Sequence, residues 1–257
     1  MSHCLALMVL VCCLAAACDA SGGPGGAVCH DPVVAPDAGA SGDGGGGRTC
    51  QRSEPVFVCD VPNARDLVGT PVGNGQAVGC GAIYRGAPLA GLSVQGCQAF
   101  ATLGIKTVVD LRTPQEVSSR PSSPCVTAAA TLVAAPMPIP YDVSPADYVA
   151  DLNASSSVAA AFAALGDPDA YPVYVHCTYG RDRTGVLAAL ILSALGATRQ
   201  DILQEYLLSG PRVGAYPASL NAVLDDIDRR GGIDAVLGAA GVTPQQLATL
   251  RSRAVAP

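Results

Sequence analysis

The sequence predicts an α/β protein, in which a central and mostly parallel sheet is flanked by helices and the C-terminal third is helical. Two observations lead to this prediction. Short β-branched runs are typical of buried strands, and longer segments with apolar residues at three- and four-residue spacing are typical of amphipathic helices. The two kinds of segment alternate along the chain, which favours a sheet covered by helices.

The strands are expected, in chain order, at Ala82–Arg85, Thr107–Leu111, Thr131–Ala134 and Val173–Val175. The helices are expected at Ser93–Leu103, Val158–Leu165, Thr184–Leu195, Thr198–Leu208, Leu220–Arg229, Ile233–Ala239 and Thr243–Arg253. Ser, Thr or Pro stands at several of these starts and Gly follows several of the ends, as helix boundaries require. Most of the helices follow the last strand, so the C-terminal third is helical.

The N-terminal part of the chain differs in composition from the rest. Cys4 to Ala17 is an uninterrupted apolar run, too short to span a bilayer but suited to a signal peptide, and three alanines precede Cys18 as a cleavage site would require. Residues 18–47 are rich in Gly, Asp and Ser and cannot build a core. We therefore expect a signal peptide at 1–17, a flexible tether at 18–47 and one folded domain at 48–257.

The signal resembles that of a bacterial lipoprotein, in which Cys18 after the cut would carry a lipid. A freely secreted protein and a mis-assigned start are the alternatives. The expected location is therefore outside the cytoplasm, either lipid-anchored to the bacterial cell envelope or secreted. Cysteine usage agrees, because six cysteines outside the signal and the motif described below suit disulfides of open pairing: Cys29, Cys50, Cys59, Cys80, Cys97 and Cys125.

Charge and histidine content exclude several function classes. All 15 basic residues and 17 of the 21 acidic residues lie in the predicted domain, and this near balance argues against nucleic acid as a partner. His176 is the only histidine of that domain, which excludes a three-histidine zinc site and an H-E-x-x-H helix. No metal and no cofactor are expected.

Residues Val173 to Gly185 predict a strand, a tight loop and a helix. The amides from Thr178 to Arg183 can form an anion nest at the helix N-terminus, which would favour the thiolate of Cys177. Arg183 would bind two phosphate oxygens with its planar fork. Alternatively, Cys177 is a small buried hydrophobe, His176 a core side chain and the arginines a solvated helix start. The combination of Cys, Gly, Arg, Thr and Gly at these spacings, where a strand leads into a helix, favours the interpretation that Cys177 is an activated nucleophile beside an anion site.

The string H-C-x5-R-T-G resembles the active-site loop of the protein tyrosine phosphatase superfamily. HCTYGRDRTG is especially similar to the H-C-x-x-G-K-D-R-T-G loop of secreted bacterial tyrosine and phosphoinositide phosphatases. Further segments of similarity, which together span roughly Val58 to Arg253, are Asn63–Gly69, Tyr84–Gly86, Ile105–Glu116 and Glu205–Ser209. The resemblance implies a cysteine-dependent phosphatase for phosphotyrosine, with phosphoserine, phosphothreonine and phosphoinositides as further candidate substrates.

The resemblance also implies roles for individual residues. Cys177 would form a cysteinyl-phosphate, Arg183 would hold the phosphoryl group and Thr184 would hydrogen-bond the sulfur. His176 would orient the loop, while Asp110 and Arg112 would support it as a structural pair. The substrate site would be lined by Thr178, Tyr179, Gly180 and Arg181.

Two loop residues depart from the related pattern. Arg181 stands in place of a lysine and keeps the positive charge that would favour polyanionic inositol head groups, although its reach and geometry differ. Tyr179 stands in place of a small residue.

The general acid has three candidates. Asp182 inside the loop is preferred, because the related bacterial group assigns the role to this position and a bound dianion would disfavour its negative charge. Asp142 and Asp147 precede Cys177 by roughly 30 to 40 residues, the spacing of the acid in much of the superfamily. The alternatives are that Asp182 caps the following helix and that the other two are loop and cap residues.

Other functions remain open. A phytase-like inositol phosphate phosphatase is the main alternative, since it would share the loop and the export signal. A rhodanese-type sulfurtransferase is disfavoured by the continuation Arg183-Thr184-Gly185, and an inactive phospho-ligand binder by the presence of both Cys177 and Arg183. The expected partner is thus a phosphorylated protein, a phospholipid or an inositol phosphate, with membrane contact only through lipid on Cys18.

Overall fold

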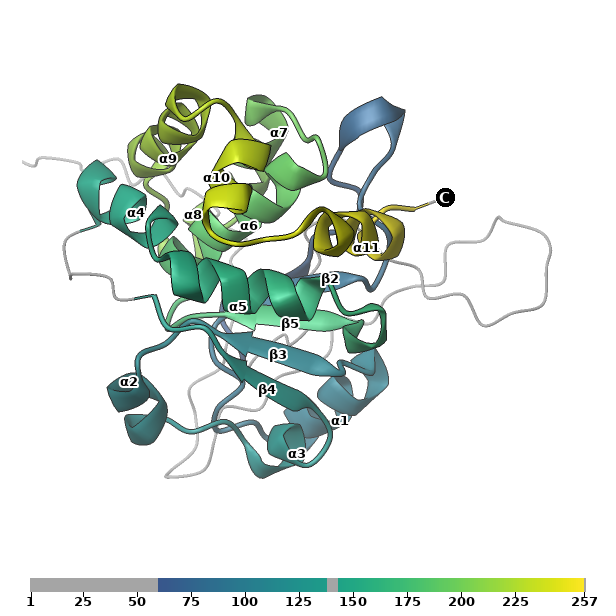
Figure 1. Ribbon diagram of the computed structural model, residues 1–257. Coiled ribbons are helices and arrows are strands. Elements are labelled where there is room, and N and C mark those ends of the chain that lie inside the picture. The colour runs from purple at the N-terminus through teal and green to yellow at the C-terminus, as the bar shows by residue number, and fades with distance from the viewer. Residues whose placement is uncertain (1–59, 138–142, 257) are drawn as a thin grey trace, which may run out of the picture. The chain divides into compact units, whose positions relative to one another are not determined.

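A computed structural model describes residues 60–137 and 143–256 of the chain (Figure 1). The predicted signal peptide, the predicted tether and Asp142 lie outside these ranges. Within them, every helix is too short or too polar to cross a membrane.

The described strands form one sheet in the order β1-β2-β5-β3-β4. Their bounds are Arg65–Asp66 for β1, Ile83–Gly86 for β2, Thr107–Asp110 for β3, Thr131–Ala134 for β4 and Val173–His176 for β5. Only β1 is antiparallel to its neighbour, so the prediction of a mostly parallel sheet is confirmed. Gly86 and Asp110 both pair with His176, so the central strands end at the same edge.

Helices cover both faces of the sheet (Figure 1). One face carries α1 (Val94–Leu103) and α3 (Pro124–Thr127), which pack Phe100 and Val126 against β2, β3 and β5. The larger core lies on the other face. Its helices are α4 (Pro145–Leu152), α5 (Ser155–Leu165), α6 (Asp182–Ala194), α7 (Arg199–Leu207), α9 (Pro217–Arg229), α10 (Ile233–Ala239) and α11 (Pro244–Ala254).

Short elements complete the described chain: α2 (Pro114–Ser119), α8 (Gly210–Val213), and the single 3-10 turns Gly73–Gly75 and Pro168–Ala170. The predicted strands and helices are confirmed to within about three residues at each end, which is the usual uncertainty of boundaries. The helices expected from Val158, Thr184 and Leu220 begin earlier, at Ser155, Asp182 and Pro217.

Strand β1 and helices α2, α3, α4 and α8 are not among the predicted elements, because two strand residues or one to two helical turns show too little periodicity. The start signals of α2 and α4 are nevertheless in the sequence. Thr113 caps α2 and Ser144 caps α4; each is followed by Pro and forms a reciprocal capping box with Glu116 or Asp147.

Helix α6 is the central helix of the larger core. Every residue in it except Ser193 is buried, including the polar residues Asp182, Arg183 and Thr184 of its first turn. A helix that is buried all round has no freedom to shift without disrupting the core. The loop that precedes α6 is therefore attached to a fixed element.

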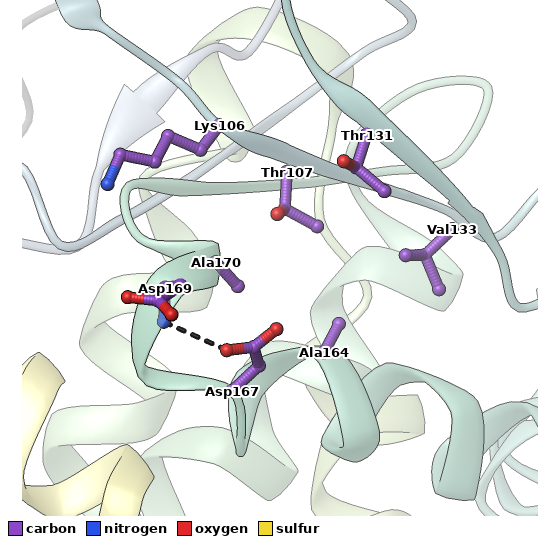
Figure 2. Close-up of a pocket in the computed structure, with 8 residues that line it drawn as sticks. All are labelled: Lys106, Thr107, Thr131, Val133, Ala164, Asp167, Asp169 and Ala170. Atoms are coloured by element: carbon purple, nitrogen blue, oxygen red, sulfur yellow. Dashed lines mark hydrogen bonds between the residues drawn. The ribbon is translucent and has the colours of Figure 1, made fainter.

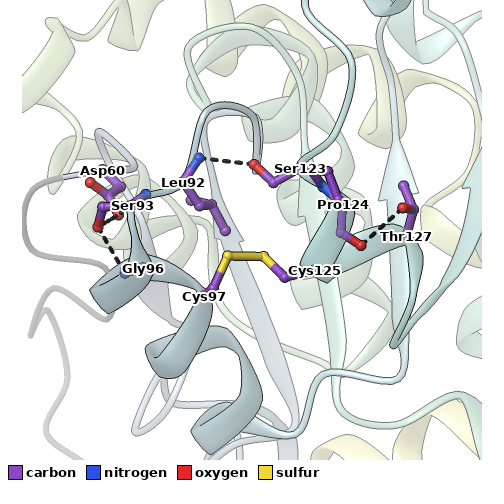
Figure 3. Close-up of a disulfide and its surroundings, with 9 residues drawn as sticks. All are labelled: Asp60, Leu92, Ser93, Gly96, Cys97, Ser123, Pro124, Cys125 and Thr127. Atoms are coloured by element: carbon purple, nitrogen blue, oxygen red, sulfur yellow. Dashed lines mark hydrogen bonds between the residues drawn. A yellow bond between two sulfur atoms is a disulfide. The ribbon is translucent and has the colours of Figure 1, made fainter.

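A disulfide joins Cys97 of α1 to Cys125 of α3 (Figure 3). Cys80 is also disulfide-bonded, so the disulfide prediction is confirmed for the cysteines that the structure describes. Cys29, Cys50 and Cys59 lie outside the described residues.

Candidate active site

Cys177 directly follows β5, at the sheet edge where β2 and β3 also end. Its thiol is free, and the residue is 1% exposed. The loop from Thr178 to Arg181 then leads into α6. A cavity of about 340 Å³ lined by Lys106, Thr107 and Thr131 lies elsewhere, at the strand starts (Figure 2). The candidate phosphate site is thus the loop, not this cavity.

The loop carbonyls face two buried side chains. Asn63 Nδ2 donates to the oxygens of Tyr179 at 3.3 Å and Gly180 at 2.8 Å, and Arg85 Nη2 donates to that of Gly180 at 2.9 Å. In a planar trans peptide the C=O of one residue and the N–H of the next point in opposite directions. The amides of Gly180 and Arg181 therefore point away from Asn63 and Arg85, and they donate to no described residue. Such free amides are what an anion nest requires.

Gly180 allows this arrangement through its backbone. Its φ is +65°, a left-handed conformation that glycine adopts without strain. A Cβ on Gly180 would also overlap the backbone of Gly86 and Ala87, at the end of β2. The position therefore admits only glycine.

Glu205 of α7 holds the network beneath the loop together. Its carboxylate accepts from Arg65 Nε at 2.8 Å and from Arg85 Nη1 at 2.5 Å, and all three side chains are buried. Burial would raise the pKa of Glu205, but the two guanidinium groups outweigh it and hold this pKa below its ordinary value. Two arginines and one carboxylate leave a net positive charge under the anion site.

Glu116 of α2 holds the guanidinium of Arg183. Arg183 Nη1 and Nη2 donate to the two oxygens of Glu116 at 2.7 and 2.6 Å, and Nη1 also donates to the carbonyl of Leu111 at 3.2 Å. The hydrogen bonds from Arg183 are the main reason why the pKa of Glu116 lies well below its ordinary value. Glu116 lay within the similar segments but was not among the predicted site residues. Its role depends on a contact 67 residues away in the sequence.

Asp110 and Arg112 form a pair next to the loop. Arg112 Nη2 and Nε donate to Asp110 at 2.7 and 2.9 Å, and Nη1 reaches the carbonyl of Arg120. His176 Nδ1 lies 3.2 Å from the carbonyl of Cys177 and 3.6 Å from Asp110. Burial lowers the pKa of His176 to about 4, against the charge of Asp110, so its ring is neutral at pH 7.

Thr184 does not make its expected contact in this structure. Its hydroxyl is buried and has no hydrogen-bond partner among the described residues, the sulfur of Cys177 included. Thr184 lies in the first turn of α6, shortly after the loop. The residue is nevertheless next to Arg183, at the base of the loop.

Arg181 is turned toward α8 and Asp182. Its Nε and Nη2 donate to the two oxygens of Asp182 at 2.7 and 3.1 Å, and Nη1 donates to the carbonyl of Val213. The charge of Arg181 is thus paired with Asp182 in this structure, and the binding of a polyanionic substrate by Arg181 stays a prediction.

Asp182 does not cap α6. The helix begins at Asp182 itself, and its carboxylate accepts from Arg181 and, at 2.5 Å, from the hydroxyl of Tyr148. The capping alternative is therefore wrong. Asp147 is the third residue of α4 and completes the capping box of that helix by accepting from the amide of the cap residue Ser144.

Asp151 of α4 is not among the predicted site residues. It is fully buried, and neither carboxylate oxygen has a hydrogen-bond partner among the described residues. Burial raises the pKa of Asp151 to about 8; the charge of Arg183 opposes this, while those of Asp182 and Asp147 add to it. Asp151 is thus a protonated acid at neutral pH near the loop, and no local sequence signal distinguishes it from other helical aspartates.

The family model described as the tyrosine phosphatase family matches residues 57–256. The chain therefore belongs to the tyrosine phosphatase family. The resemblance read from the sequence is confirmed at this level, and the finer assignment to secreted bacterial enzymes stays a prediction.

Similar proteins carry related names. The chain is 32% identical over 170 residues to a tyrosine-protein phosphatase of Cupriavidus necator, covering 59% of this chain and 62% of that relative. It is 28% identical over 162 residues to a tyrosine-protein phosphatase of Nostoc commune, covering 58% and 55%. The chain thus spans less than two thirds of either relative. Among solved structures, the core catalytic domain of the PP-IP phosphatase SIW14 of S. cerevisiae aligns with a TM-score of 0.41 at 20% identity, covering 71% of this chain and 95% of that one.

Proposed function

We propose that the protein is a cysteine-dependent phosphatase that hydrolyses phosphate monoesters, phosphotyrosine foremost, through a cysteinyl-phosphate. The observation that carries the proposal is the orientation of the loop from Thr178 to Arg181. The carbonyls of Tyr179 and Gly180 are bound on one side, and the amides of Gly180 and Arg181, which donate to no described residue, point to the other side, in the loop that joins Cys177 to Arg183. This arrangement suits a phosphate dianion beside a nucleophile.

The proposed reaction has two displacements. In the first, the thiolate of Cys177 attacks phosphorus, an S–P bond forms, and the P–O bond to the leaving group breaks while an acid protonates the leaving oxygen. In the second, water attacks phosphorus and gives a proton to the carboxylate that the acid has become, the S–P bond breaks, and inorganic phosphate and the thiolate are released. The loop amides and Arg183 stabilise the charge on the equatorial oxygens in both steps.

Turnover of an aryl phosphate tests the proposal. The purified protein should hydrolyse it at a rate unaffected by EDTA, because Arg183 and the amides stabilise the charge. Cys177→Ser should abolish turnover yet retain phosphate binding, measured by calorimetry, since a hydroxyl is a far weaker nucleophile here. A rate that requires a divalent cation, or Cys177→Ser with wild-type turnover, would contradict the proposed function.

We propose further that the protein is exported, with lipid on Cys18 as the anchor. The disulfide between Cys97 and Cys125 supports an oxidising compartment. Cell fractionation with thiol counting tests this proposal: soluble cytoplasmic protein with free thiols at both cysteines would contradict it.

A further inference from the structure

Two exposed tyrosines flank Arg181. Tyr179, inside the loop, is 57% exposed, and Tyr216, between α8 and α9, is 39% exposed. The guanidinium carbon of Arg181 lies 5.7 Å from the ring centre of Tyr179 and 4.6 Å from that of Tyr216. Both distances are within the range of cation–π attraction, so the arginine positions both rings. We call Tyr179, Arg181 and Tyr216 the aromatic surface.

The aromatic surface is anchored to the catalytic loop by a second route. The amide of Tyr216 donates to the hydroxyl of Tyr206 at 3.1 Å, and the hydroxyls of Tyr206 and Tyr148 lie 2.8 Å apart. Tyr148 in turn donates to Asp182, whose carboxylate also binds Arg181. These contacts lead from Tyr216 back to Arg181. They hold Tyr216 in place relative to the loop, although Tyr216 lies 37 residues after Tyr179 in the sequence.

The charge of this surface is already balanced. Arg181 is paired with Asp182 through two hydrogen bonds and is bound to the carbonyl of Val213. A substrate with several phosphates finds no free cation there and would have to displace Asp182 to gain one. An aromatic ring attached to the phosphate, in contrast, can pack against an exposed tyrosine without displacing anything.

We propose that the aromatic surface binds the aryl group of the substrate and selects phosphotyrosine in a polypeptide over phosphoserine and over polyanionic inositol phosphates. The inference rests on the proposed function, because it concerns the same loop. Tyr179 lies only two residues from Cys177 in the catalytic loop, and its ring is exposed to a substrate bound at that loop. Because Arg181 contacts both rings, Tyr216 extends the same surface.

The test compares one peptide carrying either phosphotyrosine or phosphoserine, together with inositol hexakisphosphate. The wild-type protein should show the highest kcat/KM for the phosphotyrosine peptide. Tyr179→Ala should lower the ratio of the phosphotyrosine to the phosphoserine kcat/KM by about 3- to 10-fold, chiefly through KM, and Tyr179→Phe should preserve it. Tyr216→Ala should lower the ratio in the same direction. Leu132→Ala, which removes an exposed apolar side chain (45%) from β4, is the matched control and should leave the ratio unchanged.

A second variant tests the charge argument. Arg181→Lys replaces the planar fork by a flexible ammonium that cannot hold Asp182 and both rings at once. Turnover of inositol hexakisphosphate should rise relative to that of the phosphotyrosine peptide. Unchanged ratios in Tyr179→Ala and Arg181→Lys, or a wild-type preference for inositol hexakisphosphate, would overturn this inference alone. A wild-type protein that turns over no phosphate ester would overturn the proposed function and the inference with it.

Discussion

Arg85 donates a hydrogen bond of 2.9 Å to the carbonyl oxygen of Gly180, 95 residues further along the chain. This bond turns the following amide, that of Arg181, toward the opposite side. The orientation of the loop amides therefore depends on a side chain outside the loop, that of Arg85 on β2, which is itself held by Glu205.

Glu205→Gln should weaken both the fold and the anion site. The amide keeps the shape of the side chain but leaves Arg65 and Arg85 without a counter-charge in the core, at a cost of about 3–5 kcal/mol. Urea unfolding measures the loss, and calorimetry with inorganic phosphate should show weaker binding. Asp228→Asn breaks an exposed ion pair with Arg199 and should cost at most about 1 kcal/mol. Equal losses in the two variants would contradict the role of Glu205.

Lowering the pH should weaken the ion pairs of Glu205 with Arg65 and Arg85. Because the folded pKa of Glu205 is lowered, its contribution to stability is full above the ordinary carboxyl pKa of about 4.3 and is lost as the pH falls through the folded pKa. The stability difference between wild type and Glu205→Gln should therefore shrink below about pH 4. A difference that stays constant down to pH 2 would argue against the charge pairing.

Gly180→Ala should abolish phosphate binding and turnover, because the positive φ and the backbone of Gly86 both exclude a side chain. The control is Gly104→Ala, which has a φ of +63° but open space around the added carbon. It should cost only about 1–2 kcal/mol of stability, without affecting phosphate binding. Turnover in Gly180→Ala comparable to that of the control would show that the loop conformation is not required.

Asp182 remains the predicted general acid. The prediction is tested by comparing aryl phosphates with good and with poor leaving groups. Asp182→Asn should slow aryl phosphates with poor leaving groups by about 10²- to 10⁴-fold and hardly affect those with good ones. Asp147→Asn is the control and should reduce stability through α4 without such selectivity. Equal slowing of all esters by Asp182→Asn would instead indicate that Asp182 holds Arg181 and Tyr148 in place.

Asp151 should make the protein less stable as the pH rises. With a pKa of about 8 in the folded state and about 3.9 when unfolded, Asp151 retains a proton in the folded state that the unfolded chain loses. The free energy of unfolding therefore falls between pH 4 and 8, by on the order of a few kcal/mol. Asp151→Asn should flatten this slope in urea unfolding at several pH values. The same slope in both proteins would mean that Asp151 is ionised in the fold.

The sequence predicted the parts of the site that are close together in the chain. Strand, loop and helix around Cys177 follow from local patterns, and so do the nucleophile and Arg183 as candidates. Contacts between distant segments could not be predicted. Glu116 meets Arg183 across 67 residues and Glu205 meets Arg85 across 120, and nothing local to either carboxylate shows which arginine it will face. The same holds for Arg181, whose charge is satisfied by a neighbouring carboxylate and by a carbonyl 32 residues away.

The lack of acceptors for the amides of Gly180 and Arg181 also affects the rate at which these amides exchange their hydrogens with solvent. Amides of the buried helix α6 should exchange only when the protein unfolds globally, whereas those of Gly180 and Arg181 should exchange rapidly. Bound phosphate would accept their hydrogen bonds and slow their exchange, with little change in α6. Occupancy of the site could then be followed residue by residue in a protein that performs no chemistry, such as Cys177→Ser.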